Sequence, residues 1–195
     1  MADAAIRAMT LEEFFQWDNG TDTRYELIGG FPVATAPGLE DHGVLALRLG
    51  AWIDAGLANR RPCRAGTESG ILHSGRADTF FVADVAATCA PREARRQYMQ
   101  DPILLVEVLS PSTERHDRRI KVPAYQRIAS VQETLLIDSD NRYAELHRRQ
   151  GAEWIIQLVI GDAGTISLAS VGIEISMSEL YEGFVFPEEE AVPGP

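Results

Sequence analysis

One segment constrains the fold more than any other. Residues 102–109, PILLVEVL, are apolar at nearly every position. A strand with one wet face alternates apolar and polar residues, whereas an almost unbroken apolar run is typical of a central strand covered on both faces. Such a strand needs further layers of structure on both sides. The run therefore predicts that residues 102–109 form a central strand covered on both faces.

Periodicity and turn residues elsewhere predict both helices and strands. Thr10 and Glu13 have the spacing of a helix capping box, and residues 29–30, Gly-Gly, separate two short segments as a hairpin turn does. An apolar stripe predicts a helix over residues 41–58. Further strands are expected at 63–72, 78–82, 134–138, 143–149, 154–160 and 165–168, the last four as an antiparallel series. Helices are expected at 113–128, with a kink or late start before Pro123, and at 178–181.

Length and composition favour one globular domain. With 195 residues, 45% of them hydrophobic, the chain can bury one substantial core. We expect a single domain over residues 9–186 and a disordered acidic tail over residues 187–195. No apolar run approaches the ~20 residues that span a bilayer, and no signal peptide is recognisable, so a cytoplasmic protein without membrane contact is expected. Cys63 and Cys89 are expected to be ordinary buried thiols.

The charge distribution bears on nucleic-acid binding in two ways. A net charge of -11 argues against broad attraction to nucleic acid, because phosphate binding relies on clustered cations. Fifteen of the 18 basic residues nevertheless lie between Arg60 and Arg149, and residues 151–195 contain none. A polyanion could approach a local basic face, although ordinary solvated arginines would give the same pattern.

Two residues are the first candidates for chemistry. Lys121 is the one lysine among 18 basic residues, and a compact ammonium serves purposes that a guanidinium cannot. Glu107 interrupts the apolar strand, and a buried carboxylate must be paired, hydrogen-bonded or bound to a metal. The alternatives are a lysine left by chance on a solvated helix face, and a structural ion pair between Glu107 and an arginine.

Other carboxylates could complete a site with Glu107. Asp78 begins the expected strand 78–82 and could share one end of the sheet with Glu107, where carboxylates and backbone carbonyls suit Mg²⁺. Asp84 competes with Asp78, but its place beyond the apolar stretch favours a strand stop. Glu26 could bind a second cation or orient a water, or it could be an exposed hairpin glutamate.

Several motifs follow one another along the chain: YELIGG at 25–30, His42 at a helix start, RAD at 76–78, PILLVEVLSPST at 102–113 and DRRIK at 117–121. This series resembles one known family, the Uma-two family of restriction-endonuclease-like proteins in the PD-(D/E)XK nuclease superfamily. The similarity extends over residues 9–186, and its most specific part is the run EVLSPST followed by Asp and Lys.

The resemblance implies an α+β (mixed α/β) fold. This fold is a restriction-endonuclease-like PD-(D/E)XK core, whose central mixed sheet is flanked by helices and extended by antiparallel strands. Asp78 matches the motif aspartate, preceded by Ala77 where proline is usual, and Glu107 matches the motif glutamate. The usual lysine position holds Leu109, which cannot serve, and in this family the lysine is displaced onto the following helix, where Lys121 stands.

The activity implied by the resemblance is metal-dependent hydrolysis of DNA phosphodiester bonds, and a homodimer is expected by analogy. One alternative is a catalytically silent nuclease-fold protein that binds nucleic acid or a protein partner, and another is hydrolysis of a different phosphate ester. For His42, a helix-capping or packed histidine is the competing interpretation. The expected site contains Asp78, Glu107 and the Val108 carbonyl as ligands of Mg²⁺ or Mn²⁺, Lys121 and Glu26 as further catalytic groups, and His42 as a substrate-orienting residue.

Overall fold

The structure is a computed structural model that describes residues 7–18, 20–35 and 38–186. The tail predicted for residues 187–195 lies outside the described residues. Among the described residues, no helix is long and apolar enough to cross a membrane. The largest element is an eight-stranded sheet built from β1 (Arg24–Ile28), β2 (Phe31–Thr35), β3 (Arg64–Leu72), β4 (Phe80–Thr88), β5 (Pro102–Leu109), β6 (Glu133–Asp138), β7 (Tyr143–Gln150) and β8 (Glu153–Ile160).

The sheet is mixed, as the sequence predicted. Its strands follow the order β2-β1-β4-β5-β6-β7-β8, and β3 pairs with β4 off this path. β5 and β6 run parallel, while the other paired strands described here run antiparallel. A parallel pair needs a crossover connection. A helical segment after β5 makes it, formed by α3 (Glu114–His116), a π-helical stretch η1 (Asp117–Lys121) and α4 (Val122–Tyr125).

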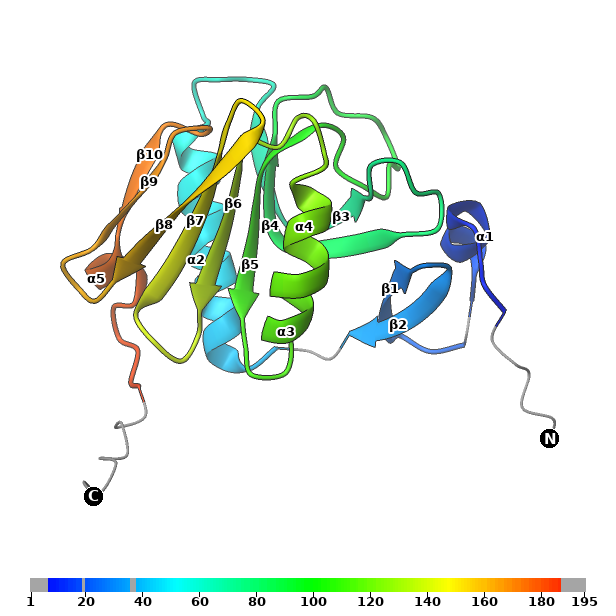
Figure 1. Cartoon of the computed structure of the whole chain (residues 1–195), viewed down its shortest axis with the longest axis horizontal. Helices are drawn as coiled ribbons and strands as arrows, with labels where there is room; N and C mark the ends of the chain where they lie inside the picture. Colours follow the sequence, from blue (N-terminus) through cyan, green and yellow to red (C-terminus); the bar gives the residue numbers. More distant parts are fainter. Residues whose placement is uncertain (1–6, 19, 36–37, 187–195) are drawn as a thin grey trace, which may run out of the picture.

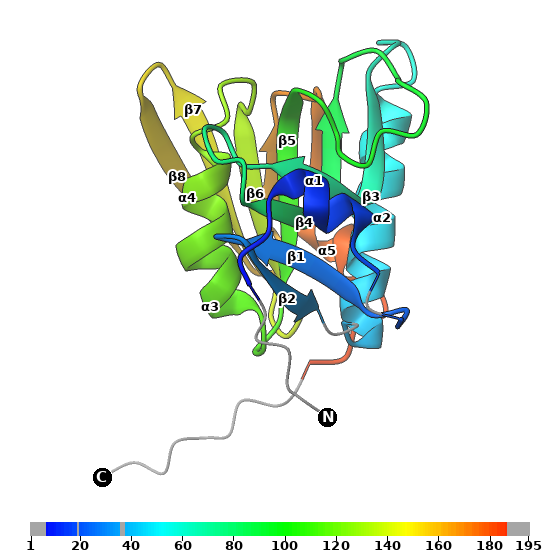
Figure 2. The same cartoon turned by 90° about the vertical axis from the view of Figure 1, so that its right-hand side faces the viewer.

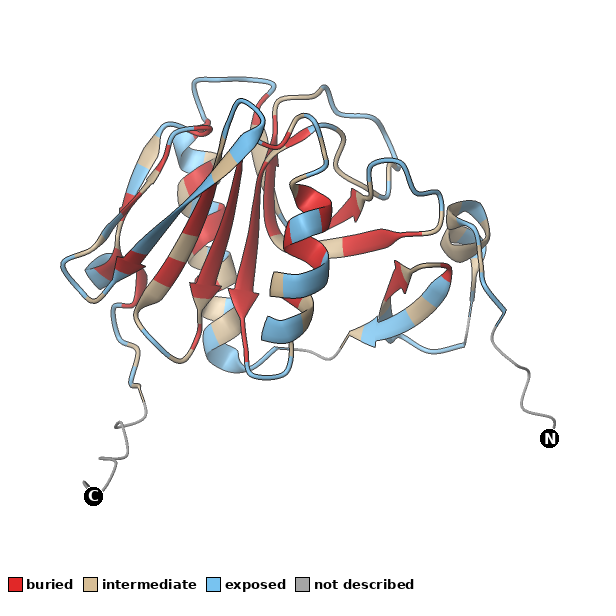
Figure 3. Cartoon of the chain, viewed as in Figure 1, coloured by how far each residue is buried: buried red, intermediate tan, exposed pale blue. Residues whose placement is uncertain are grey.

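Helices cover both faces of the sheet. α2 (Glu40–Gly56) lies on one face, and α3 and α4 lie on the other (Figures 1 and 2). The apolar stripe of α2 faces the sheet, and Leu45, Leu49 and Ile53 are fully buried. β5 is buried at seven of its eight positions (Figure 3), which confirms that the apolar run is a central strand. The fold class predicted from the sequence is therefore confirmed.

The N-terminal elements follow their local signals. Thr10 caps α1 (Leu11–Gln16), and Glu13 completes the capping box. β1 and β2 pair around Gly29 and Gly30, whose φ angles of 59° and 86° are those that glycine allows at low cost in a tight hairpin turn.

Pro123 explains the unusual winding of the crossover helix. Proline lacks the N–H that would bond the carbonyl of residue 119, and its ring crowds that carbonyl. The chain adopts the wider π-helical stretch η1 immediately before α4, and Pro123 takes the second position of α4. The sequence predicted a kink or a late helix start near Lys121, whereas the helical segment begins at Glu114 and changes to π-helical winding over Asp117–Lys121. Such π-helical turns occur frequently at functional sites.

Two strand predictions were wrong. β4 runs from Phe80 to Thr88, rather than over residues 78–82, so Asp84 does not end the strand but lies in its middle. β9 (Thr165–Leu168) does not continue the antiparallel series of β6, β7 and β8. It pairs instead with β10 (Ile173–Ser176) in a separate two-stranded sheet, followed by α5 (Met177–Leu180). β9 and β10 bury Ile166, Leu168 and Ile175 in the core cluster shared with α2.

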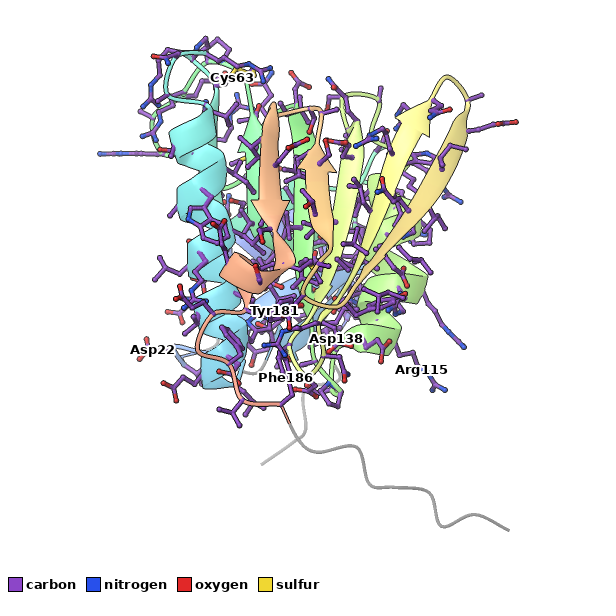
Figure 4. The ribbon with its side chains drawn as sticks, turned by 90° about the vertical axis from the view of Figure 1, so that its left-hand side faces the viewer. Asp22, Cys63, Arg115, Asp138, Tyr181 and Phe186 are labelled. Atoms are coloured by element: carbon purple, nitrogen blue, oxygen red, sulfur yellow. A yellow bond between two sulfur atoms is a disulfide. The ribbon has the colours of Figure 1, made fainter. Side chains whose placement is uncertain are left out.

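The expectation of free thiols was also wrong, because Cys63 and Cys89 form a disulfide. Cys63 precedes β3 and Cys89 follows β4, and the pairing of Arg64 with Thr88 brings the two cysteines together. Figure 4 shows Cys63 at one end of the molecule and Asp22 at the other. Non-local strand register created this contact, and cysteine count and spacing gave no sign of it.

Candidate active site

The candidate site lies along one edge of β4, at the point where its two neighbours on that edge, β1 and β5, diverge. We call this point the fork. β1 pairs with β4 at Phe80, whereas β5 pairs with β4 from Val85 onward. Both strands use the same edge of β4, because β3 pairs along the other edge. Residues 82–84 therefore face a gap between β1 and β5. Backbone groups in a buried gap need hydrogen-bond partners, and here side chains provide them.

A cavity of about 670 Å³ opens at this fork, and we call it the site cavity. Six carboxylates, one ammonium and one guanidinium from different parts of the chain line it. Asp22, which lines its rim, lies at the end of the molecule opposite the disulfide (Figure 4). Lys121 of η1 forms a cluster with the four carboxylates that act on its charge, Glu26 of β1, Asp84 of β4, Glu107 of β5 and Asp117 of η1.

Lys121 is the centre of this cluster. Its Nζ donates to the Val82 carbonyl at 2.9 Å and lies 3.1 Å from Glu26 Oε1 and 3.2 Å from Glu107 Oε2. Asp117 Oδ1 is 3.4 Å away. An ammonium has three donors, which these nearest oxygens can satisfy. The helix after β5 thus returns Lys121, only 7% exposed, to the strand carrying Glu107.

Glu107 is held from two sides. Tyr125 donates its hydroxyl to Oε1 at 2.5 Å, and Lys121 donates to Oε2 at 3.2 Å. Tyr125 is fully buried, and burial together with the Glu107 carboxylate raises its pKa well above the ordinary value. Its phenol proton therefore stays on the oxygen. These contacts fix the carboxylate orientation within an otherwise apolar strand.

Glu26 is buried rather than exposed on its hairpin. Its Oε1 accepts the Val82 N–H at 2.9 Å, and its Oε2 lies 3.2 Å from His116 Nε2. Burial alone would raise the pKa of this carboxyl. The contacts with His116, Lys121 and the Val82 amide outweigh burial and lower the pKa, so Glu26 is ionised at neutral pH.

Asp84 is the carboxylate that accompanies Glu107. Val85 pairs with Val106, and extending this register by one residue places Asp84 opposite Glu107. Asp84 Oδ2 accepts the Val108 N–H at 2.7 Å and lies 3.2 Å from His42 Nε2. The hydrogen bond to Asp84 raises the pKa of His42 despite partial burial. His42, in the first turn of α2, therefore contacts a carboxylate of the site.

Asp78 does not lie in the site cavity, and its predicted place beside Glu107 was wrong. It precedes β4, its side chain is 41% exposed, and both its oxygens accept from Arg76 at 2.9 and 3.0 Å. Six residues of extended strand separate it from Asp84, a distance of about 20 Å. The arginine beside it lowers the pKa of Asp78. Asp78 is thus a paired surface carboxylate.

The backbone at the fork is also irregular. The register of β3 with β4 omits Glu68, which would lie opposite Asp84, and the φ of Glu68 is 46°. A side chain other than glycine adopts this left-handed conformation at a cost. Glu68 lines the site cavity and pairs with Arg24.

Sequence reasoning found part of this cluster and missed the rest. It proposed Glu26, His42, Glu107 and Lys121, which line the cavity, and Val108, whose N–H contacts Asp84 although Val108 itself is not among the lining residues. Asp84 was considered but interpreted as a strand stop, and Asp117, His116 and Tyr125 were not proposed as site residues.

Signals for three of the missed residues were present in the sequence. Asp84 interrupts an apolar run, residues 80–87, in the same way that Glu107 interrupts its strand. Asp117 and Tyr125 stand four residues before and after Lys121, a spacing that places helical side chains on one face. His116 had no comparable signal.

The carboxylates outnumber the nearby cations. Burial raises the pKa of Glu107 well above its ordinary value against the opposing effect of Lys121, and burial also raises the pKa of Asp117. Burial disfavours the charged form of Lys121. The carboxylates of Glu107, Glu26 and Asp117 outweigh this and hold the lysine pKa well above its usual range. The lysine stays charged, and the cluster retains an excess of acidic groups.

The cluster offers carboxylate oxygens, which suit a hard divalent cation. The described side chains are not already arranged around one cation position. Carboxylate oxygens are the ligands preferred by Mg²⁺. No described residue donates to Asp84 Oδ1, and the carbonyl of Val108 points to the same strand edge as its N–H, towards Asp84. Among the described residues, no three His, Cys, Asp or Glu side chains are already arranged around a common metal position.

A mixed sheet with a parallel central pair, two carboxylates on neighbouring strands and a lysine on the crossover helix defines a protein of the restriction-endonuclease-like class. Residues 11–178 match the model of the Uma2 family, described as "Putative restriction endonuclease". The chain therefore belongs to this family, and the predicted resemblance is confirmed.

Individual proteins are similar to this chain over most of its length. Uncharacterized protein slr1290 of Synechocystis sp. (strain ATCC 27184 / PCC 6803 / Kazusa) is 29% identical over 189 residues, covering 94% of this chain and 96% of the relative. Uncharacterized protein sll1609 of the same strain is 24% identical over 177 residues, covering 89% and 99%. A crystal structure described as a putative nuclease belonging to DUF820, from Anabaena variabilis ATCC 29413, superposes with a TM-score of 0.73. At 19% identity, covering 89% of this chain and 97% of the neighbour, it supports the fold.

Proposed function

We propose that the protein is a metal-dependent endodeoxyribonuclease that hydrolyses DNA phosphodiester bonds. The observation that carries this proposal is the convergence of Asp84, Glu107 and Lys121 in one cavity. Two carboxylates of different strands and a charged lysine suit phosphoryl chemistry, in which negative charge must be held and offset. Family membership supports the nuclease class.

Asp84, Glu107 and the Val108 carbonyl would hold Mg²⁺ or Mn²⁺, so Asp84 takes the role first assigned to Asp78. When bound, the cation would polarise the scissile phosphate and make water easier to deprotonate. The raised pKa values of Glu107 and Asp117 support the need for such a cation, because a bound cation would favour the ionised form of these carboxyls.

The residues of the chain itself would perform the remaining tasks. Lys121 keeps its proton on Nζ, so it would offset negative charge that develops on the phosphate and position the attacking water. Tyr125 holds Glu107, and His42 holds Asp84, so both carboxylates are oriented before substrate arrives. Glu26, which stays ionised and lines the cavity, would accept a proton or orient a water.

DNA is the substrate that the surroundings favour. Arg115 and Arg119 are exposed on the segment that carries Lys121, and Figure 4 shows Arg115 extending away from the body of the molecule. Exposed arginines on the segment that carries a site residue can contact phosphates, which compensates locally for the acidic net charge. The cytoplasmic location stays a prediction, and the Cys63–Cys89 disulfide counts against it because disulfides are rare in reducing compartments.

The test is cleavage of supercoiled plasmid and of oligonucleotides with Mg²⁺ or Mn²⁺. Wild type is compared with Asp84→Asn, Glu107→Gln and Lys121→Met, which remove charge at nearly constant volume. Each substitution should reduce the cleavage rate at least about 100-fold. The matched control is Asp78→Asn, an equal change at an exposed aspartate six residues away, and it should cleave like wild type.

Three results would change the proposal. Loss of activity in Asp78→Asn but not in Asp84→Asn would return the aspartate role to Asp78. Unchanged cleavage in all three site variants would remove the cavity as the active site. Inactive wild type with either metal on varied DNA would favour the alternative of a silent nuclease-fold protein that binds nucleic acid or a protein partner.

A further inference from the structure

β8 is an open edge of the large sheet with an apolar surface. The strand order ends at β8, and in Figures 2 and 4 no described element lies beyond its outer edge. Figure 3 shows most of the strand as exposed. The exposed aliphatic side chains are Ile155 at 45%, Ile156 at 55%, Leu158 at 53% and Ile160 at 67%.

Such an edge normally carries a feature that blocks pairing. Natural proteins protect edge strands with lysine, proline, bulges or a covering element. β2, at the other end of the strand order, contains Pro32, which lacks a donor. β8 has neither proline nor a basic residue, and its eight residues pair with β7 without a register shift. The edge is therefore regular, uncharged over most of its length and able to accept another strand.

The hydrogen-bond pattern shows which backbone groups face outward. Gly161 donates its N–H to the Arg142 carbonyl on the β7 side. Backbone groups alternate in direction along a strand, so the odd residues of β8 bond to β7 and the even residues face the open edge. The outward residues are Trp154, Ile156, Leu158 and Ile160. The side chains of these four share the α4 face of the sheet, because Trp154 packs against the core cluster that contains Ala124 and Tyr125.

We propose that two copies of this chain associate by antiparallel pairing of their β8 strands, with a two-fold axis at Gln157. In this register Trp154 pairs with Ile160 of the second copy, and Ile156 pairs with its Leu158. All four outward residues then exchange bonds, giving on the order of eight backbone hydrogen bonds. A shift by one residue would place outward groups opposite inward ones and lose the ladder.

A second copy fits this edge for reasons of charge and shape. The one charged residue of β8, Glu153, falls opposite Gly161 of the second copy, so no like charges face each other. The apolar strips of both copies become continuous on the α4 face, where cross-strand aromatic and aliphatic pairs are favourable. With a net charge of -11 per copy, association is least opposed at a patch that carries almost no charge.

The first test measures molar mass by light scattering across a range of protein concentrations. Wild type should approach twice the mass of one chain. Leu158→Lys should raise the dimer dissociation constant by about tenfold or more, whereas Leu47→Lys, an equal change at a residue 67% exposed on α2, should not. Wild type that stays monomeric, or a dimer that survives Leu158→Lys unchanged, would overturn the proposal. A monomer whose β8 pairs with a strand of another protein would also overturn the proposal.

The second test fixes the register and does not depend on how the lysine variant folds. Gln157→Cys places two cysteines at a non-hydrogen-bonded pair with Cα atoms about 4.5 Å apart, within disulfide range. Mild oxidation should cross-link it into covalent dimers, since the native cysteines are already paired. Ile155→Cys is the control, because its own copy would lie about 13 Å away along the strand. Equal cross-linking of both variants would contradict the register, and no cross-linking of Gln157→Cys would contradict the interface.

Discussion

Replacing Lys121 by methionine tests whether the lysine holds the site cavity together. The ammonium donates to Val82 and contacts Glu26 and Glu107 within 3.2 Å. Hydrogen bonds that involve charged groups contribute about 1.5–3 kcal/mol each, so the gross interaction is roughly 4.5–9 kcal/mol. Desolvation of the buried ammonium offsets several kcal/mol of this. We therefore expect Lys121→Met to lower the free energy of unfolding by about 3–5 kcal/mol.

Urea unfolding followed by circular dichroism measures this change, and the thermal midpoint should fall by roughly 6–20 °C for a chain of this size. Glu107→Gln removes the charge that Lys121→Met leaves unpaired. The double variant should therefore be more stable than the sum of the single effects predicts, with a coupling of about 1–3 kcal/mol. Arg119→Met, an exposed change two residues earlier, should stay within about 0.5 kcal/mol of wild type.

Two outcomes would refute this reasoning. A Lys121→Met variant as stable as wild type would mean that the buried carboxylates do not need the ammonium. Strictly additive effects of Lys121→Met and Glu107→Gln would mean that the two groups are not coupled in the folded protein, despite their 3.2 Å separation.

Three further predictions concern metal, disulfide and DNA. Mg²⁺ or Mn²⁺ at ten times its dissociation constant should stabilise the protein by about 1.4 kcal/mol, which is visible as a raised melting temperature. The Asp84→Asn variant should not show this shift in melting temperature. Loss of the shift in Asp78→Asn would contradict the proposed metal site. Reducing the Cys63–Cys89 disulfide, whose cysteines are 26 residues apart, should lower the free energy of unfolding by about 3 kcal/mol in urea titrations, and an unchanged midpoint would show that the bridge does not constrain the unfolded chain. Changing Arg115 and Arg119 to glutamine should reduce the salt dependence of DNA binding by about two units of slope in a fluorescence titration, and an unaltered slope would place the DNA elsewhere.

Local signals were sufficient for most elements. The apolar run 102–109, the capping box of α1 and the Gly29-Gly30 turn each act within a few residues, and each appears in the structure. Glu107 and Lys121 were visible for the same reason. A carboxylate within an apolar strand and a lone lysine are exceptions to a local pattern, and both residues are buried in one cluster.

Contacts between distant segments were not predictable in this way. Asp78 and Asp84 both lie near apolar residues, and only the register of β4 against β5 shows that Asp84 faces Glu107. The disulfide depends on the register of β3 against β4. The burial of Glu26 depends on the gap between β1 and β5, which no single segment encodes.

The sequence by itself determined the family, the mixed sheet and four residues that line the candidate site, because these follow from short motifs and from the pattern of apolar residues. The tertiary structure decided which aspartate joins Glu107, which cysteines meet and which edge of the sheet stays open. These outcomes depend on strand pairing between segments far apart in the chain. A shift of one or two residues in that pairing exchanges the faces and partners of every side chain involved.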